Sequence, residues 1–242
     1  MTKLMHKITR RIITDIGTRN DSTRDKWVKD ALLRLPKGFR LLDAGAGQSR
    51  YREYCAHLNY VSQDFCKYNG AGDGRALQTG IWDTGKINIV SDIDRIPVED
   101  CSFDAVLCTE VLEHIPDPVA AIKEFYRLLK PGGELILTAP FCSFTHMAPY
   151  HFYSGFNRYF YEHYLPGLGF NISEITANGD YAEYTGQELR RVLTIYGKIP
   201  FYIKACVAIL LRFIGAHRNK IDSNDGLLCF GYHVRAVKRG SK

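Results

Sequence analysis

Short apolar runs alternate with helical patterns through the middle of this 242-residue chain, and that alternation limits the fold more than any other feature. Each run enters a polar or glycine-containing turn, as the strands of a parallel sheet do. Crossover helices between such strands build an α/β sheet, whose binding crevice lies at the carboxyl ends of the strands. We therefore predict an α/β fold with central strands at residues 40–44, 60–64, 87–91, 104–109 and 134–138.

The clearest helix is predicted between the last two of these strands. Asp117 is a candidate N-cap, Pro118 suits the first helical position, and the run PGG at 131–133 ends the helix. The apolar positions recur at helical spacing, so we expect the sheet to be covered by Val119, Ile122, Phe125, Tyr126 and Leu129.

The length suits one α/β domain that carries an insertion. We predict a basic helical extension over residues 1–37 and a domain over 38–242. Within this domain we expect an aromatic-rich loop at 141–165 and a helical insertion at 178–227. Further elements are predicted on the same patterns: strands near 170–175 and 228–237, and helices near 186–194 and 200–213.

The net charge of +6 is unevenly distributed. Residues 1–40 and 198–242 together carry a net charge of +14, and the middle carries −8. Basic ends suggest an anionic neighbour, such as a membrane surface, a phosphorylated substrate or nucleic acid, although a solvated basic surface explains them as well. The seven cysteines form no C-x-x-C pair, and the start of the chain lacks a signal-peptide core. We therefore expect a reducing compartment and a cytoplasmic protein.

Two segments are candidates for peripheral membrane contact. The apolar segment 200–216 is interrupted by Lys204 and Arg212, and it is shorter than the ~20 residues that a spanning helix needs. The basic N-terminus has one apolar face, formed by Leu4, Ile8 and Ile12. Both segments can equally be ordinary packing or lid helices.

A strand that enters a glycine-rich turn is the candidate ligand site. Gly45 and Gly47 follow the run that ends in Asp43, and glycines let backbone N–H groups approach a ligand closely. Dinucleotide-binding proteins share such a turn, but Asp43 would repel a pyrophosphate and attract a cationic ligand. Asp64, at the end of the next strand, can accept hydrogen bonds from two ribose hydroxyls. These residues indicate a nucleoside ligand, and an NAD-dependent oxidoreductase remains an alternative.

The stretch that follows contains three spaced runs: SDIDRIPVED, FDAVLCTEVLEHIPDP and LKPGGELILTAP. Together with the glycine-rich turn, residues 38–140 and the segment 231–238 resemble the class I S-adenosylmethionine-dependent methyltransferase family, in its type 11 form. The resemblance implies a Rossmann-like, doubly wound sheet of seven strands, mostly parallel with an antiparallel closing strand. It also implies S-adenosyl-L-methionine as the cofactor.

The resemblance assigns the donor-binding residues as well. A loop on the methionine side would consist of Asp43, Gly45, Ala46 and Gly47, and the ribose would be bound by Asp64. The adenine amino edge would be held by Asp92 and the backbone of Ile93, and the floor beside the sulfonium would be formed by Cys108, Thr109 and Glu110. The chain departs from the family pattern at Ser49, where a third glycine is usual. This change should alter how tightly the loop packs.

Histidines and aromatic residues gather after the fifth predicted strand, in a segment that resembles the acceptor loop of methyltransferases of surface-glycan and small-metabolite pathways. A hydroxyl acceptor needs a general base, and our hypothesis is that His146 or His151 is that base. Tyr150 and Tyr153 would shape the acceptor pocket and stack on a ring. In the alternative, the aromatic residues form a lid or cap, and the histidines only form hydrogen bonds to it. We interpret His114 as a hydrogen-bonded loop histidine.

The predicted function is methyl transfer to a small molecule, favoured as O-methylation of a sugar or glycan precursor. N-methylation or C-methylation of another metabolite is an alternative, as is a donor-binding, membrane-associated protein without catalysis. We predict no metal, because the histidines include no pair at i, i+4, and because His146 and His151 without nearby paired carboxylates are a poor ligand set. We expect no nucleic-acid partner, since the chain carries no recognition motif.

Overall fold

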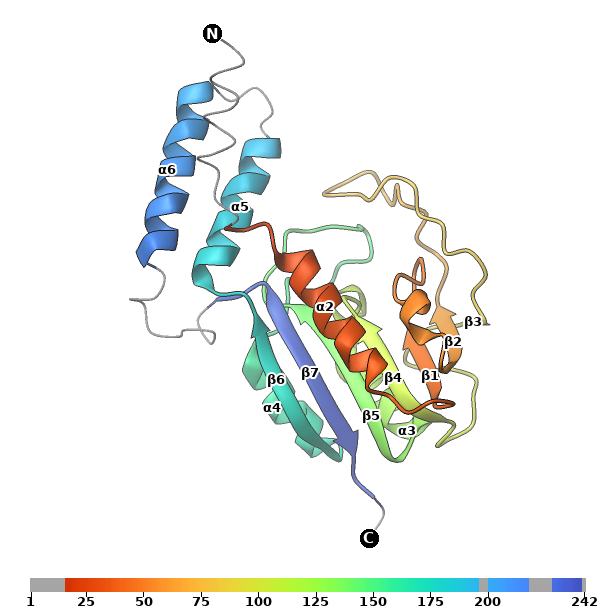
Figure 1. The fold of residues 1–242 in the computed structure, drawn as a ribbon. Coiled ribbons are helices and arrows are strands. Elements are labelled where there is room, and N and C mark those ends of the chain that lie inside the picture. Colours follow the sequence, from red (N-terminus) through yellow and green to blue (C-terminus); the bar gives the residue numbers. More distant parts are fainter. Residues whose placement is uncertain (1–15, 196–199, 218–227, 241–242) are drawn as a thin grey trace. The chain divides into compact units, whose positions relative to one another are not determined.

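The structure is a computed structural model that describes residues 16–195, 200–217 and 228–240 (Figure 1). The predicted basic amphipathic start falls largely on residues 1–15, which lie outside the described residues. The same holds for residues 196–199 and 218–227 of the predicted insertion.

Seven strands form one sheet in the order β3-β2-β1-β4-β5-β7-β6. β1 pairs in parallel with β2 and β4, β2 pairs in parallel with β3, and β4 pairs in parallel with β5. β7 runs antiparallel to β5. The predicted Rossmann-like sheet, mostly parallel with an antiparallel closing strand, is therefore confirmed. The strands are β1 (Arg40–Ala44), β2 (Asn59–Asp64), β3 (Ile89–Val90), β4 (Phe103–Thr109), β5 (Leu129–Pro140), β6 (Phe170–Asn178) and β7 (Gly231–Lys238).

The helices of the described chain are α2 (Asn20–Leu33), α3 (Pro118–Leu128), α4 (Arg158–Gly167), α5 (Tyr181–Ile195) and α6 (Phe201–His217). The start of α3 is as predicted, because the Asp117 side chain accepts a hydrogen bond from the Ala120 backbone N–H at 2.9 Å. Figure 1 shows α2 across one face of the sheet, with α3 and α4 behind the strands. The sheet therefore has helices on both faces.

Several local predictions differ from the structure, among them Leu129, which was expected on the helix and instead begins β5. The glycine-rich turn leads into a short 3₁₀ helix, Arg52–Cys55, and no regular helix opens near Ser49, whose φ of 54° lies in the left-handed region. The third strand is only Ile89–Val90, because it pairs with just two residues of β2 at the edge of the sheet. The segment 141–165 is not all loop, since α4 begins at Arg158.

The core beneath α2 explains why this helix belongs with the sheet. Val28, Ala31 and Leu32 are buried in one hydrophobic cluster with β-strand residues that include Leu41 and Ile136. Burial of apolar side chains is the dominant favourable term in folding, so this cluster fixes α2 against the strands. The N-terminal extension predicted over 1–37 thus contributes to the core of the domain.

The chain divides into two compact units. The sheet-bearing unit comprises residues 24–176 and 231–242, and the helical unit comprises residues 1–23 and 177–230, with α5 and α6. This division differs from the boundary that we expected after residue 37, because α2 packs with the strands from Arg24 onward. No helix within the described residues is both long enough and apolar enough to cross a membrane.

Candidate functional site

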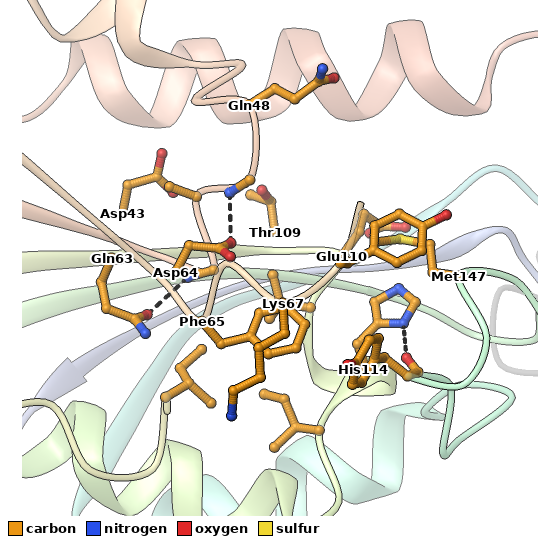
Figure 2. A pocket seen from close by; sticks show the side chains of 18 of the residues that line it. Asp43, Gln48, Gln63, Asp64, Phe65, Lys67, Thr109, Glu110, His114 and Met147 are labelled. Carbon is orange, nitrogen blue, oxygen red and sulfur yellow. Dashed lines mark hydrogen bonds between the residues drawn. The ribbon is translucent and has the colours of Figure 1, made fainter. Parts of the chain in front are cut away.

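A cavity of about 620 Å³ lies in the sheet-bearing unit, at the carboxyl ends of β1, β2 and β4. This is where an α/β sheet of this topology binds ligands. Residues after three strands and from two long loops line it (Figure 2). Among them are these predicted donor-site residues: Asp43, Gly45, Ala46, Gly47, Asp64, Asp92, Ile93, Thr109 and Glu110.

The glycine-rich turn approaches its neighbours too closely for side chains. A Cβ on Gly45 would lie 2.6 Å from Cγ1 of Val111, and a Cβ on Gly47 would lie 2.7 Å from Cζ2 of Trp82. Both glycines have positive φ, 72° and 51°, which L side chains rarely adopt. The backbone N–H of Gly45 donates to Oε1 of Gln63 at 3.2 Å, so β2 holds the turn in place (Figure 2). The turn thus exposes backbone to the cavity, as a ligand cradle requires.

Two carboxylates flank this turn. Asp43 is only 3% exposed, and burial raises its pKa from 3.8 to about 6, although the hydrogen bond that the Tyr60 hydroxyl donates at 2.6 Å opposes this shift. Asp64 accepts hydrogen bonds from the backbone N–H groups of Gly47, at 2.9 Å, and Cys66, at 2.8 Å. Asp64 is therefore oriented by the loop itself. The Asp43 carboxylate lies where a cationic ligand would compensate its buried charge.

The third carboxylate is more open. The Asp92 side chain is 68% exposed and forms an ion pair with Lys67 at 3.1 Å. Beyond it, Thr109 and Glu110 line the floor of the cavity, but Cys108 does not, because it is fully buried in the sheet. Side chains alternate between the two faces of a strand, so neighbouring residues of β4 cannot all reach the cavity. The structure thus brings together every predicted donor-site residue except Cys108.

One cavity residue that the sequence did not indicate comes from α2. Arg24 lines the cavity, is only 8% exposed, and forms an ion pair with Glu110 at 3.1 Å. The second oxygen of Glu110 accepts a hydrogen bond from the Thr138 hydroxyl at 2.9 Å. Arg24 was missed because it lies 16 residues before the first strand, in a segment that we assigned to an extension.

Two loops carry aromatic side chains to the cavity. The loop after β2 contributes Phe65, Tyr68 and Trp82, and the loop after β5 contributes Tyr150 and Phe152. The loops are joined by backbone hydrogen bonds from Leu77 N–H to the Thr145 carbonyl, from Met147 N–H to the Leu77 carbonyl, and from Asp73 N–H to the Ala148 carbonyl. The predicted aromatic loop after β5 and the loop after β2 thus together form a cover over the cavity. Trp82 was missed because the loop after β2 has no periodic apolar pattern.

Three histidine rings meet beside this cover. The centroid of the His146 ring lies 4.7 Å from that of His114 and 4.7 Å from that of His151, and the His114 and His151 rings are 5.8 Å apart. The backbone carbonyl of Glu113 accepts hydrogen bonds from two N–H groups of the loop after β5, at 2.9 and 3.2 Å, which brings these histidines to β4. His114 and His146 line the cavity, and His151 does not.

Burial shifts the pKa values of side chains in this histidine cluster. It lowers the pKa of His114 to about 4, assisted by the neighbouring His146, and it also lowers the pKa of His151. The predicted hydrogen bond of His114 is present: its Nδ1 lies 2.5 Å from the Tyr150 carbonyl oxygen (Figure 2). Burial raises the pKa of Glu113 well above its usual range, and the charge of Glu110 adds to the effect. His114 is therefore neutral near pH 7.

The two predicted acceptor tyrosines differ in their positions. Tyr150 lines the cavity, with its ring edge against Phe65 at a centroid distance of 5.0 Å. Tyr153 is not among the residues that line it. The Tyr153 hydroxyl donates to the Pro116 carbonyl at 3.0 Å, and its ring lies against Phe156. Tyr153 thus holds the loop after β5 against the segment that contains Pro116.

Known proteins match the part of the chain that contains the predicted donor-binding residues. Residues 42–137 match the family model described as a methyltransferase domain. The curated relatives include a ubiquinone biosynthesis O-methyltransferase of Xanthomonas axonopodis pv. citri, which is 35% identical over 109 residues, 43% of this chain and 44% of that protein. The chain thus spans about half the length of the curated relatives that it matches.

Solved structures share the fold over most of the chain. The cyclase SpnF has a TM-score of 0.56 at 18% identity, covering 90% of this chain and 81% of its own. A Haemonchus contortus phosphoethanolamine N-methyltransferase 2, solved with S-adenosyl-L-methionine, has a TM-score of 0.53 at 16% identity, covering 90% and 53%. One fold thus serves different reactions, so the site must carry the functional argument. By sequence, the similarity to a methyltransferase domain extends over residues 42–137.

Proposed function

We propose that this chain transfers the methyl group of S-adenosyl-L-methionine to a hydroxyl group of a small molecule. One observation carries the proposal: Asp43, Asp64 and Asp92 surround a single cavity whose glycine-rich turn has no room for side chains. The methyltransferase domain match over residues 42–137 supports it independently. A pyrophosphate would meet the buried Asp43 carboxylate, which disfavours a dinucleotide.

The cavity offers a partner for each part of the donor. Asp43 suits the cationic methionine end, and Arg24 suits its carboxylate, since guanidinium groups bind carboxylates well. Asp64 suits the ribose hydroxyls, and Asp92 with the Ile93 backbone suits the adenine amino edge. When bound, the donor supplies an electrophilic methyl carbon on a sulfonium. The cavity residues hold this carbon opposite the acceptor and exclude competing water.

The acceptor is assigned to the side of the cavity where histidines and aromatic rings gather. His146 or His151 accepts the hydroxyl proton as the new O–CH₃ bond forms and the S–CH₃ bond breaks. Tyr150 packs against a flat acceptor, and Tyr153 shapes the pocket from behind. The O-methyltransferase name of the relatives supports oxygen as the reacting atom. A hydroxyl on a sugar or glycan precursor is one candidate acceptor, and a hydroxyl on an unsaturated ring is the other.

Methyl transfer from labelled donor tests the proposal directly. The purified chain is incubated with donor carrying a labelled methyl group and with two sets of acceptors, sugars and hydroxylated rings. The proposal expects labelled product from one set. His146→Ala and His151→Ala are then compared at saturating donor, with His163→Ala on the exposed face of α4 as the control. Unchanged turnover in both variants would remove the histidines from the role of base.

A second proposal concerns location. The described side chains of α6 include several large apolar groups that are exposed, such as Ile209 at 63% and Tyr202 at 67%. Exposed apolar groups on a helix within a basic segment support peripheral contact with an anionic membrane. Co-sedimentation with anionic and neutral vesicles tests this. Binding to anionic vesicles at low salt is expected, and its absence would leave α6 a packing helix.

A further inference from the structure

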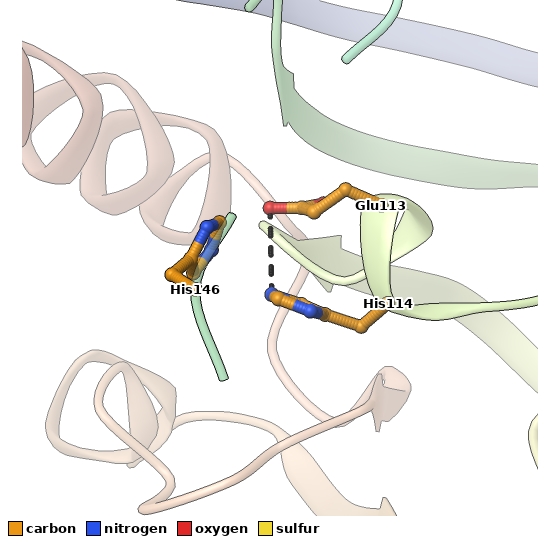
Figure 3. A group of neighbouring side chains, drawn as sticks. All are labelled: Glu113, His114 and His146. Carbon is orange, nitrogen blue, oxygen red and sulfur yellow. Dashed lines mark ion pairs between the residues drawn. The ribbon is translucent and has the colours of Figure 1, made fainter. Parts of the chain in front are cut away.

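We propose that Glu113, His114 and His146 form a binding site for a divalent transition-metal ion, with Zn²⁺ as the first candidate. One potential ligand atom from each residue lies within 4.8 Å of the other two. Figure 3 shows the three side chains converging, with a dashed line between Glu113 and His114, a pair that is ionic only if His114 is protonated. The methyl-transfer proposal does not require this ion, and its consequence for the acceptor rests on that proposal.

The hydrogen bonds of the two histidines occupy one ring nitrogen of each residue and leave the other as a potential ligand. Nδ1 of His114 lies 2.5 Å from the Tyr150 carbonyl oxygen, and Nδ1 of His146 lies 2.8 Å from the Phe144 carbonyl oxygen. A carbonyl oxygen only accepts, so each Nδ1 carries the hydrogen and each Nε2 keeps a lone pair. Histidines that ligate metals are held in this way, with the second ring nitrogen donating to a carbonyl or carboxylate.

The carboxylate of Glu113 completes a set of acceptors. Its Oε1 lies 3.7 Å from Nε2 of His114, too far for a hydrogen bond. Its Oε2 is buried, since the residue is only 1% exposed, and this oxygen has no hydrogen-bond partner within the described residues. A buried carboxylate without a partner is costly. Acceptors that converge without a donor between them require a cation or an extra proton.

The spacing and the ligand types fit a catalytic zinc site. Ligands at about 2.1 Å from a tetrahedral ion lie about 3.4 Å apart, close to the 3.7 Å between Oε1 of Glu113 and Nε2 of His114. The remaining separations, up to 4.8 Å, need only side-chain adjustment. Two histidines and one glutamate leave a fourth position open for water or substrate.

The open position faces the cavity, because His114 and His146 both line it. If methyl transfer occurs as proposed, an acceptor hydroxyl oxygen can occupy that position, and a bound cation lowers the pKa of such an oxygen. This role differs from the sequence-based prediction of no metal. The sequence concealed the site because His146 lies 32 residues beyond His114 and the two meet only through the hydrogen bonds of the loop after β5.

Metal binding is measured on full-length protein without a polyhistidine tag, stripped with a chelator, in the absence of donor and acceptor. Zn²⁺ affinity is obtained by competition with a chromophoric chelator, and visible spectra of the Co²⁺ form report the coordination geometry. We expect one equivalent of metal in the wild type and in the control His163→Ala. Glu113→Gln and His146→Ala should bind at least about a hundredfold more weakly.

His146→Ala decides the question if Glu113→Gln does not fold, because His146 is only partly buried in a loop. Equal Zn²⁺ affinity in His146→Ala and wild type would overturn the site, as would failure of the wild type to bind one equivalent. Donor binding is measured separately on the metal-free protein. Metal binding without donor binding would refute the proposed function alone, and donor binding without metal binding would refute the site alone.

Discussion

Replacing Asp43 by Asn should separate the contribution of this carboxylate to ligand binding from its effect on the free energy of unfolding. Burial raises the pKa of Asp43 from 3.8 to about 6. Between these values the folded chain binds more protons at this carboxyl than the unfolded chain does. The wild type therefore loses stability as the pH rises through this window, and the loss is complete just above the upper value.

The magnitude follows from the shift. A change of roughly two pKa units corresponds to about 3 kcal/mol of destabilisation once both states are ionised. At about pH 4.5 only about 1 kcal/mol of this cost is present, because the folded state is still protonated. Asn does not titrate. The difference in free energy of unfolding between Asp43→Asn and wild type should therefore shift by about 2 kcal/mol in favour of the variant between about pH 4.5 and about pH 8.

Urea unfolding of the ligand-free proteins at the two pH values measures this shift. Asp92→Asn is the matched control, because the Asp92 side chain is 68% exposed and surface substitutions have small effects. The comparison between variant and wild type cancels the titrating groups that do not interact with Asp43. A difference between Asp43→Asn and wild type that does not change with pH would refute the argument that Asp43 is ionised at a cost in the fold.

The same variant should bind the donor poorly. A hydrogen bond to a charged group contributes about 1.5–3 kcal/mol, so Asp43→Asn should weaken S-adenosyl-L-methionine binding by about tenfold to a hundredfold. The donor should also raise the melting temperature of the wild type more than that of the variant. Equal donor affinity in the two proteins would remove Asp43 from the donor site.

Three further substitutions test other parts of the account. Gly45→Ala should unfold more readily by at least about 1 kcal/mol and lose donor affinity, while Gly38→Ala, with positive φ but open space around its Cβ, measures the backbone strain alone in urea unfolding. Equal losses in the two would rule out the steric argument. Leu32→Ala should destabilise the sheet-bearing unit by about 2–5 kcal/mol in the same assay, because it removes a fully buried side chain beneath α2. A loss below about 1 kcal/mol would show that α2 is not part of the core. Arg24→Gln should raise KM for the donor about tenfold with little change in kcat, and an unchanged KM would remove Arg24 from the donor site.

The convergence of most of the expected donor-binding residues on one cavity could be predicted from the sequence because it depends on local patterns. Gly45 and Gly47 lie in the turn after β1 and Asp64 ends β2, so the alternation of strands and turns places them at one edge of the sheet. Cys108 was expected in the floor but is not among the residues that line the cavity, because the resemblance does not say which face of β4 each residue occupies. The face is decided by the pleat of the strand.

The remaining residues could not be predicted because their positions depend on tertiary contacts. Arg24 reaches the cavity through the packing of α2, and Trp82 through hydrogen bonds between two irregular loops. His114 was correctly predicted as a hydrogen-bonded loop histidine, yet its neighbours His146 and Glu113 give it a further role in our proposal. The distance along the chain between these residues hides their convergence.

Calorimetric titration of the wild-type chain with S-adenosyl-L-methionine, and separately with NAD, tests the central claim most directly. We predict saturable binding of S-adenosyl-L-methionine at one site per chain, weakened by about tenfold to a hundredfold in Asp43→Asn, and no measurable binding of NAD. Binding of NAD without binding of S-adenosyl-L-methionine would contradict the assignment of this cavity to a methyl donor.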